Sequence, residues 1–139
     1  MKQEDKELLL KDLCARLPYN PLISINGERY RMEEIRNAII GINVYKITVD
    51  GCDIEYMNIK PYLFPLSSMS NEQKLEIKSL CDGTEIFDDG SWMSYISILG
   101  NFNFEINLAV VDWFNKNHFD YRGLIPKGLA IDATGKGIY

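Results

Sequence analysis

Two tight-turn dipeptides, each next to β-forming residues, constrain most strongly what this chain can fold into. Asn26-Gly27 follows the apolar run 23–25. Asp50-Gly51 joins residues 44–49 to residues 54–59, and both of these runs are rich in β-branched and aromatic residues. Asn-Gly and Asp-Gly readily adopt the positive φ angles that two-residue hairpin loops require. The sequence therefore predicts two antiparallel β-hairpins within the first sixty residues.

Helical spacing of apolar residues predicts a helix over residues 3–17, and Pro18 ends it. Its apolar face is expected to hold Leu9, Leu10, Leu13, Cys14 and Leu17, with Lys6, Glu7, Lys11 and Asp12 elsewhere. The pattern over 30–40 is compatible with either a helix or a strand, and we interpret it as a short helix.

Two further helices are predicted in the second half of the chain. Ser70 and Gln73 have the spacing of a capping box, which predicts a helix over 71–80 that ends before Asp82-Gly83. Residues 106–117 form a strongly apolar helical pattern.

The positions of prolines and the alternation of apolar and polar residues predict the remaining elements. Pro61 and Pro65 bracket residues 62–64, which predicts an extended connector or a sheet edge. Asp89-Gly90 indicates a turn. The runs 95–98 and 102–104 alternate between apolar and polar residues, which is typical of strands.

The connecting segments are short and contain no low-complexity tract, which favours one domain over residues 1–139. The chain is 46% hydrophobic and 25% charged, as is usual for a globular domain. We therefore expect a single small α+β domain with an N-terminal helix, antiparallel hairpins or a small barrel-like sheet, and two further helices.

Negative charge is concentrated in one segment. The chain carries 20 acidic and 15 basic residues, but none of the basic ones lies within 79–115. Asp82, Glu85, Asp88, Asp89, Glu105 and Asp112 lie in that segment. Nucleic-acid binding draws on clustered Lys and Arg, so this distribution disfavours it. Asp88 and Asp89 are candidate binding residues for a basic partner or in a mimic of nucleic acid, although solubilising charge on turns is the favoured interpretation.

The three cysteines do not form a metal-binding or disulfide pattern. Cys14, Cys52 and Cys81 are widely spaced and odd in number, so we expect reduced, buried side chains with no metal site and no cofactor. The charged N-terminal residues do not resemble an export signal, and the longest uncharged stretch, 90–104, is too short to cross a bilayer. These features predict a cytoplasmic location without membrane partners.

The densest group of polar functional side chains follows the last predicted helix. His118, Asp120, Tyr121 and Arg122 could bind a small ligand, because histidine moves protons near neutrality and arginine holds anions. The alternative is that these residues stabilise the end of the helix. No nucleophile elbow and no complete phosphate-binding loop are present in the sequence, so no catalytic residues are assigned and a non-enzymatic protein is expected.

A second candidate binding element lies between the two prolines. Tyr62 and Phe64 could present an apolar edge to another protein.

Three segments carry a family resemblance: 12–19 (DLCARLPY), 59–69 (IKPYLFPLSSM) and 112–126 (DWFNKNHFDYRGLIP). Together they resemble a family of short uncharacterised proteins of gut Bacteroides-type bacteria and their phages and prophages. The resemblance implies a small intracellular protein of phage or mobile-element association. It supplies no catalytic residues, and it favours contacts with a host or phage protein.

Three functions remain open from the sequence. The first is a non-enzymatic module that acts by protein–protein interaction. The second is a ligand-binding domain or enzyme that uses residues 118–122. The third is a small β-barrel over 22–59 that binds nucleic acid, although acidic residues there outnumber the basic ones. The oligomeric state and the partner are not specified by any of these features.

Overall fold

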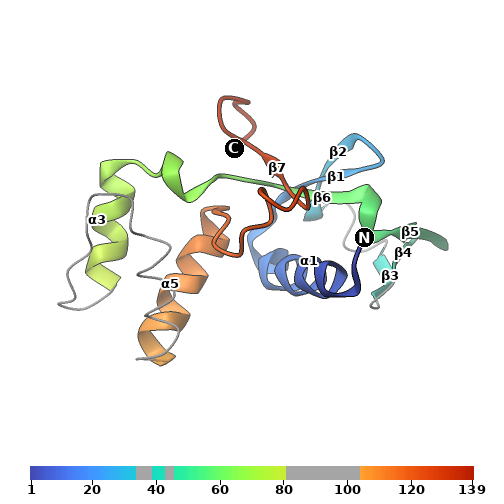
Figure 1. The fold of residues 1–139 in the computed structure, drawn as a ribbon, viewed down its shortest axis with the longest axis horizontal. Helices are drawn as coiled ribbons and strands as arrows, with labels where there is room; N and C mark the ends of the chain where they lie inside the picture. The colour runs from blue at the N-terminus through green and yellow to red at the C-terminus, as the bar shows by residue number, and fades with distance from the viewer. Residues whose placement is uncertain (34–38, 43–45, 81–103) are drawn as a thin grey trace.

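The computed structural model describes residues 1–33, 39–42, 46–80 and 104–139, and these form a mixture of helices and two sheets (Figure 1). The helices are α1 (Gln3–Arg16), α3 (Asn71–Leu80) and α5 (Phe104–Lys116), and the short 3₁₀ turns are η1 (Leu17–Tyr19), η2 (Tyr56–Asn58) and η3 (Leu66–Ser68). The strands are β1 (Leu22–Ile25), β2 (Glu28–Arg31), β3 (Ile39–Ile42), β4 (Lys46–Val49), β5 (Cys52–Glu55), β6 (Ile59–Leu63) and β7 (Ile131–Asp132). The α+β class is confirmed.

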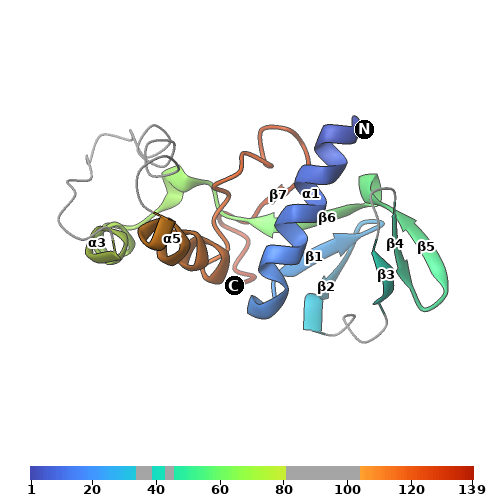
Figure 2. The same cartoon turned by 90° about the horizontal axis from the view of Figure 1, so that it is seen from below.

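The larger sheet has the strand order β2-β1-β6-β7, and α1 lies across one of its faces (Figure 2). The predicted hairpin is present, since β1 and β2 pair antiparallel around Asn26 (φ 51°) and Gly27 (φ 89°). The hydrophobic core beneath α1 comprises Leu9, Leu13, Ile23, Ile25, Met32, Ile47, Tyr56 and Ile59. Burial of this apolar surface is what holds the helix on the sheet.

The buried face of α1 differs from the predicted one. It consists of Leu9, Asp12, Leu13 and Arg16, whereas Cys14 is exposed. Asp12 belongs to the buried face because it pairs with Arg16 one turn later. The predicted Leu10 and Leu17 are partly buried against the same core, so Cys14 alone among the predicted apolar positions is exposed. Cys52 is exposed as well, so the expectation of buried cysteines is wrong for both of these residues. Cys81 lies outside the described residues.

The second predicted hairpin is also present, as β4 and β5 of the smaller sheet β3-β4-β5, with Asp50 and Gly51 at its turn. The predicted strand 54–59, however, is interrupted by the η2 turn. Tyr56 is fully buried against the α1 core at this turn, and the chain then enters the larger sheet as β6. One continuous β pattern therefore serves two sheets.

The segment between the prolines lies inside the larger sheet, which corrects the prediction of a connector or an edge. β6 pairs antiparallel with β1 on one side, and its residues Tyr62 and Leu63 pair in parallel with β7 on the other. Pro61 lies one residue before the stretch that pairs with β7, so its missing N–H removes no bond from that parallel pairing.

Helices α3 and α5 lie at one end of the molecule and the β3-β4-β5 sheet at the other (Figures 1 and 2). The hydrophobic core around α3 and α5 consists of Leu66, Met69, Ile77, Val110, Phe114 and Phe119. The capping box is confirmed, because the Ser70 N–H donates to Gln73 Oε1 (2.9 Å) and the Gln73 N–H donates to Ser70 Oγ (3.2 Å).

The remaining predicted elements differ from the structure or lie wholly or partly outside the described residues. The predicted short helix over 30–40 is described only in part: Met32 and Glu33 are helical, but Tyr30 and Arg31 belong to β2 and Ile39 begins β3, while residues 34–38 are not described. Phe104 begins α5 where the run 102–104 predicts a strand. The turn at 89–90, the strand 95–98 and the helix end at 82–83 lie outside the described residues. No helix within the described ranges is both long and apolar enough to cross a membrane.

Candidate functional site

Residues 118–122 connect α5 to the end of β6. The Phe64 N–H donates to the carbonyl of His118, and the Asp120 N–H donates to the carbonyl of Phe64, both at 2.8 Å. Phe64 and Phe119 thus form an isolated parallel bridge, with their ring centroids 5.9 Å apart. Tertiary pairing therefore positions this segment.

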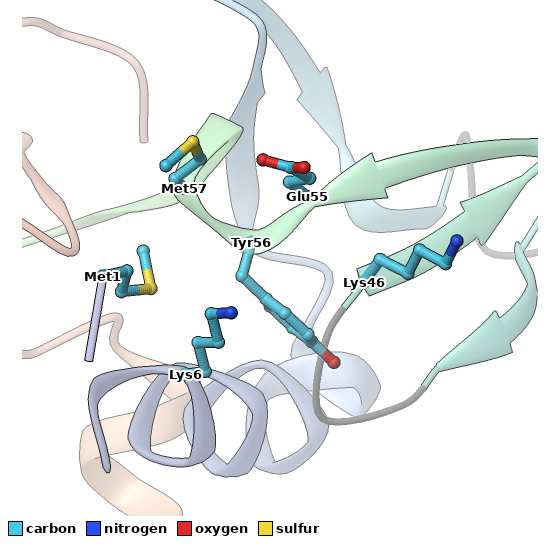
Figure 3. A pocket seen from close by; sticks show the side chains of 6 residues that line it. All are labelled: Met1, Lys6, Lys46, Glu55, Tyr56 and Met57. Carbon is cyan, nitrogen blue, oxygen red and sulfur yellow. The ribbon is translucent and has the colours of Figure 1, made fainter. Parts of the chain in front are cut away.

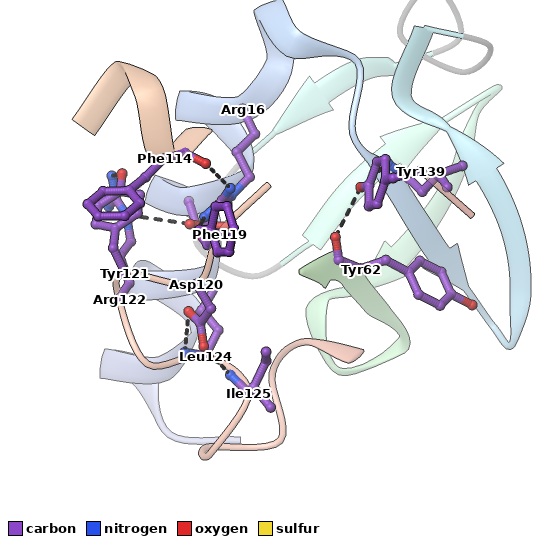
Figure 4. A network of polar contacts seen from close by, with 12 residues as sticks. Arg16, Tyr62, Phe114, Phe119, Asp120, Tyr121, Arg122, Leu124, Ile125 and Tyr139 are labelled. Atoms are coloured by element: carbon purple, nitrogen blue, oxygen red, sulfur yellow. Dashed lines mark hydrogen bonds and ion pairs between the residues drawn. The ribbon is translucent and has the colours of Figure 1, made fainter. Parts of the chain in front are cut away.

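Asp120 uses both of its carboxylate oxygens on the backbone that follows. Oδ1 accepts from the Leu124 N–H and Oδ2 from the Ile125 N–H, each at 2.8 Å (Figure 4). Only 5% of Asp120 is exposed. The side chain therefore closes a turn, as a carboxylate does when it satisfies backbone donors at a chain reversal.

Arg122 and Tyr121 join a buried network centred on α1, in which Arg122 Nη2 donates to the Tyr121 hydroxyl (2.6 Å). Arg16 pairs with Asp12 Oδ2 (2.8 Å), and Arg122 Nε lies 3.4 Å from Asp12 Oδ1. Arg16 also donates to the carbonyl oxygens of Phe114 (3.5 Å) and Phe119 (2.7 Å). Since Asp12 and Arg16 are fully buried, this network ties α1 to α5 and to the segment after it.

His118 has an unusual backbone conformation and a buried ring nitrogen. Its φ is 63°, and its ring stacks on Tyr139 at 3.9 Å between centroids. Its Nδ1 atom is buried and has no hydrogen-bond partner among the described residues. Burial lowers the pKa of His118 to about 4, and the positive charges of Arg16 and Arg31 add to this effect. The ring is therefore neutral at physiological pH.

Protonation of His118 should make stability depend on pH. An unfolded histidine titrates near about 6.5, so the unfolded state binds the proton more tightly between that pH and about 4. We expect the free energy of unfolding to fall by about 1 kcal/mol from pH 7 to pH 5, after allowance for solvent around the half-buried ring. Urea denaturation across this range measures the fall. His118→Asn, whose side chain tolerates positive φ and does not titrate, should abolish it. An unchanged slope in that variant would refute the assignment.

Tyr62 and Phe64 do not form an exposed edge. Tyr62 is 8% exposed and Phe64 is half-buried, because β1, β7 and the segment after α5 cover them. The rings of Phe64 and Tyr139 lie 5.6 Å apart. Asp88 and Asp89 lie outside the described residues.

Two adjoining cavities lie on a different part of the surface. The first, of about 500 Å³, lies between the start of α1, β4 and η2 (Figure 3). The second, of about 430 Å³, lies over the β1–β2 turn and the start of β6. Met57, which is 50% exposed, lines both. We call their lining the Met57 surface: Met1, Lys6, Ser24, Asn26, Gly27, Lys46, Glu55, Tyr56, Met57, Asn58 and Lys60.

The Met57 surface combines thioether and amine groups. Met1 is 43% exposed, and its side chain lies on the same side of the first cavity as Met57 (Figure 3). The surface includes three lysines and one glutamate, and Lys46 pairs with Asp53 beside it. Tyr56 forms the floor, where burial raises its pKa to about 12. The surface is therefore apolar at its centre and basic around it.

No three His, Cys, Asp or Glu side chains in the described parts of the chain gather closely enough to hold a metal ion. Comparison with protein-family models, with curated proteins and with solved structures finds no match to this chain.

The sequence pattern singled out residues 118–122, which the structure brings together with Arg16, Phe64 and Tyr139. It did not single out Met57 or the lysines near it. Only one signal was present: in the predicted strand 54–59, apolar Met57 occupies a position at which the two-residue alternation expects a polar residue, and polar Asn58 follows where an apolar one is expected.

Proposed function

We propose that this protein acts without catalysis by binding another protein, and that the Met57 surface is the binding site. The observation that carries the proposal is the half-exposed Met57 side chain between two adjoining cavities. Methionine is flexible and polarisable, which suits it to binding surfaces that adapt to a partner. Met1, which is 43% exposed, lines the first cavity, and Lys60, which is partly buried, lines the second.

The positive charges of this surface favour a partner segment that carries carboxylates. Lys6, Lys46 and Lys60 outnumber Glu55 along its lining, and Lys46 pairs with Asp53 just outside it. A segment that inserts an aliphatic side chain next to Met57 and carries carboxylates on either side complements this arrangement. Association should therefore weaken as the salt concentration rises.

The three segments with a family resemblance support a cellular setting for this interaction. They favour a phage- or mobile-element-associated protein in the cytoplasm whose partner is a host or phage protein. The acidic segment 79–115, with Asp88 and Asp89, is a second possible contact for a basic partner.

The test is capture from the native host during phage or prophage expression, followed by measurement of the affinity for the purified partner. Met57→Asp should weaken binding at least about tenfold, because it places a carboxylate in the apolar centre of the interface. Leu75→Asp is the matched control, since Leu75 is 65% exposed on α3, away from this surface. It should leave the affinity unchanged.

The outcomes separate the alternatives. Equal binding by the wild type and Met57→Asp would refute the Met57 surface as the site. Loss of binding on reversal of Asp88 and Asp89 alone would move the site to the acidic segment.

A further inference from the structure

The Tyr139 hydroxyl lies between the ends of two neighbouring strands. It accepts a hydrogen bond from the backbone N–H of Leu22 (2.8 Å) and donates one to the carbonyl of Tyr62 (3.0 Å) (Figure 4). Leu22 begins β1, and Tyr62 is in β6. A single phenol thus links two backbone groups of the larger sheet.

The pairing register explains why these two groups need a partner. β1 and β6 pair as Ser24↔Lys60 and Ile23↔Pro61, so Leu22 and Tyr62 are next in line. The Asn26 N–H donates to the carbonyl of Asn58 at the other end of the pairing. Hydrogen-bonded pairs alternate along antiparallel strands, which makes Leu22 and Tyr62 a hydrogen-bonding position. The phenol occupies the place of a direct bond between the strands there.

Side chains complete a slot for the aromatic ring. His118 stacks on the Tyr139 ring at 3.9 Å with an interplanar angle of 13°, and Phe64 contacts it at 5.6 Å. Burial raises the pKa of the phenol to about 12, so the hydroxyl remains a donor at neutral pH. The slot therefore consists of the stacked His118 ring, the tilted Phe64 ring, the Leu22 N–H as donor and the Tyr62 carbonyl as acceptor. This arrangement fits a phenol.

The chain just before Tyr139 is weakly anchored. Residues 134–137 are exposed, and Gly135 and Gly137 have φ angles of 73° and 61°. Ile138 is half-buried against the cluster of Leu22, Tyr62 and Ala133. Tyr139 itself keeps 39% of its surface exposed although its hydroxyl is enclosed. Apart from the packing of Ile138 and the contacts of the Tyr139 ring and hydroxyl, few buried contacts would be lost if residues 134–139 moved away from the larger sheet.

We propose that the slot formed by His118, Phe64 and the ends of β1 and β6 is a binding site for a tyrosine side chain of a partner protein, and that Tyr139 is its displaceable resident. The hydroxyl is required for binding, because a phenylalanine in the slot would leave the Leu22 N–H and the Tyr62 carbonyl without partners. Because Tyr139 is part of the same chain, its phenol competes with the partner's tyrosine for the slot at an effective concentration of roughly millimolar. This site is separate from the Met57 surface and does not depend on it.

Its test uses Tyr139→Ala and the probe N-acetyl-L-tyrosinamide. His118 is the only histidine, so its imidazole protons give a single set of NMR signals that report directly on ring stacking. The probe should shift these signals saturably in Tyr139→Ala. Wild type should require at least about ten times more probe to give the same shift, because the Tyr139 phenol must first leave the slot. N-acetyl-L-phenylalaninamide should bind Tyr139→Ala at least about tenfold more weakly than the tyrosinamide.

Tyr139→Phe provides a second arm that retains the ring and removes only the hydroxyl. Its affinity for the tyrosinamide should lie between those of wild type and Tyr139→Ala. Tyr30→Ala is the control, since Tyr30 lies on β2 and its hydroxyl bonds Glu28. It should behave as wild type. Equal binding of the two amides to either Tyr139 variant, or His118 signals that stay unmoved in the folded variants, would overturn the proposal. If Tyr139→Ala does not fold, the Tyr139→Phe result decides alone.

Discussion

Replacing Arg16 with alanine should lower the free energy of unfolding by about 3–5 kcal/mol, the range for breaking a buried ion pair. Arg16 and Asp12 are both 0% exposed, and their side chains meet at 2.8 Å. The truncation leaves the buried Asp12 carboxylate with the 3.4 Å contact to Arg122 as its one remaining ion pair among the described residues. It also removes the donors to the carbonyl groups of Phe114 and Phe119. Urea denaturation of the variant and the wild type measures the difference.

A double variant distinguishes the charge from the packing. Asp12→Leu combined with Arg16→Met replaces both charges by apolar groups and should recover part of the lost stability, because the Asp12 carboxylate no longer remains buried without Arg16. Recovery should be incomplete, since Arg122 also loses its contact with Asp12. Lys11→Ala is the matched control, since Lys11 is exposed on the same helix. It should change stability by less than about 0.5 kcal/mol. A loss of under 1 kcal/mol in Arg16→Ala would contradict the role assigned to the pair.

Replacing Phe114 with alanine should cost a similar amount, about 3–5 kcal/mol, through the cavity that it leaves. Phe114 is fully buried on α5. Its ring lies 5.5 Å from that of Tyr121 and 6.4 Å from that of Phe119, so it packs helix α5 against the segment that follows it. The expected result is a large fall in the midpoint of urea denaturation without a change in its slope.

Leu75→Ala is the control for the Phe114 variant. Leu75 is an apolar residue on the neighbouring helix α3, but it is 65% exposed, so its truncation should shift stability by less than about 0.5 kcal/mol. Comparable losses in the two variants would show that the α3–α5 core does not depend on the aromatic packing of Phe114.

Elements that depend on neighbouring residues were predictable from the sequence. Helices α1 and α5 appear within three residues of the predicted ranges at each end, and both tight turns are present. The capping box at Ser70 was predicted down to its two hydrogen bonds. These features require only contacts between residues up to four positions apart, and residue type and spacing encode such contacts directly.

Elements that depend on distant residues were not predictable. The role of residues 59–63 as an inner strand requires β1 on one side and β7, nearly seventy residues later, on the other. The turn at Tyr56 follows from burial of its ring beneath α1. The alternation of apolar and polar residues over 54–59 specifies neither the neighbouring strands of β6 nor the burial of Tyr56. Residues 54–59 were therefore predicted to form one strand.

The sequence by itself determined the fold class, the hairpin turns, the helix ends and the cluster of polar groups at 118–122, because periodicity and local chemistry specify them. Only the tertiary structure decided what those polar groups contact. Asp120 closes a turn, Arg122 reaches Asp12 across more than a hundred residues, and His118 stacks on Tyr139. It also placed Met57 between two cavities. Burial and pairing partners are set by the packing of distant segments, and no local pattern specifies which distant segment that will be.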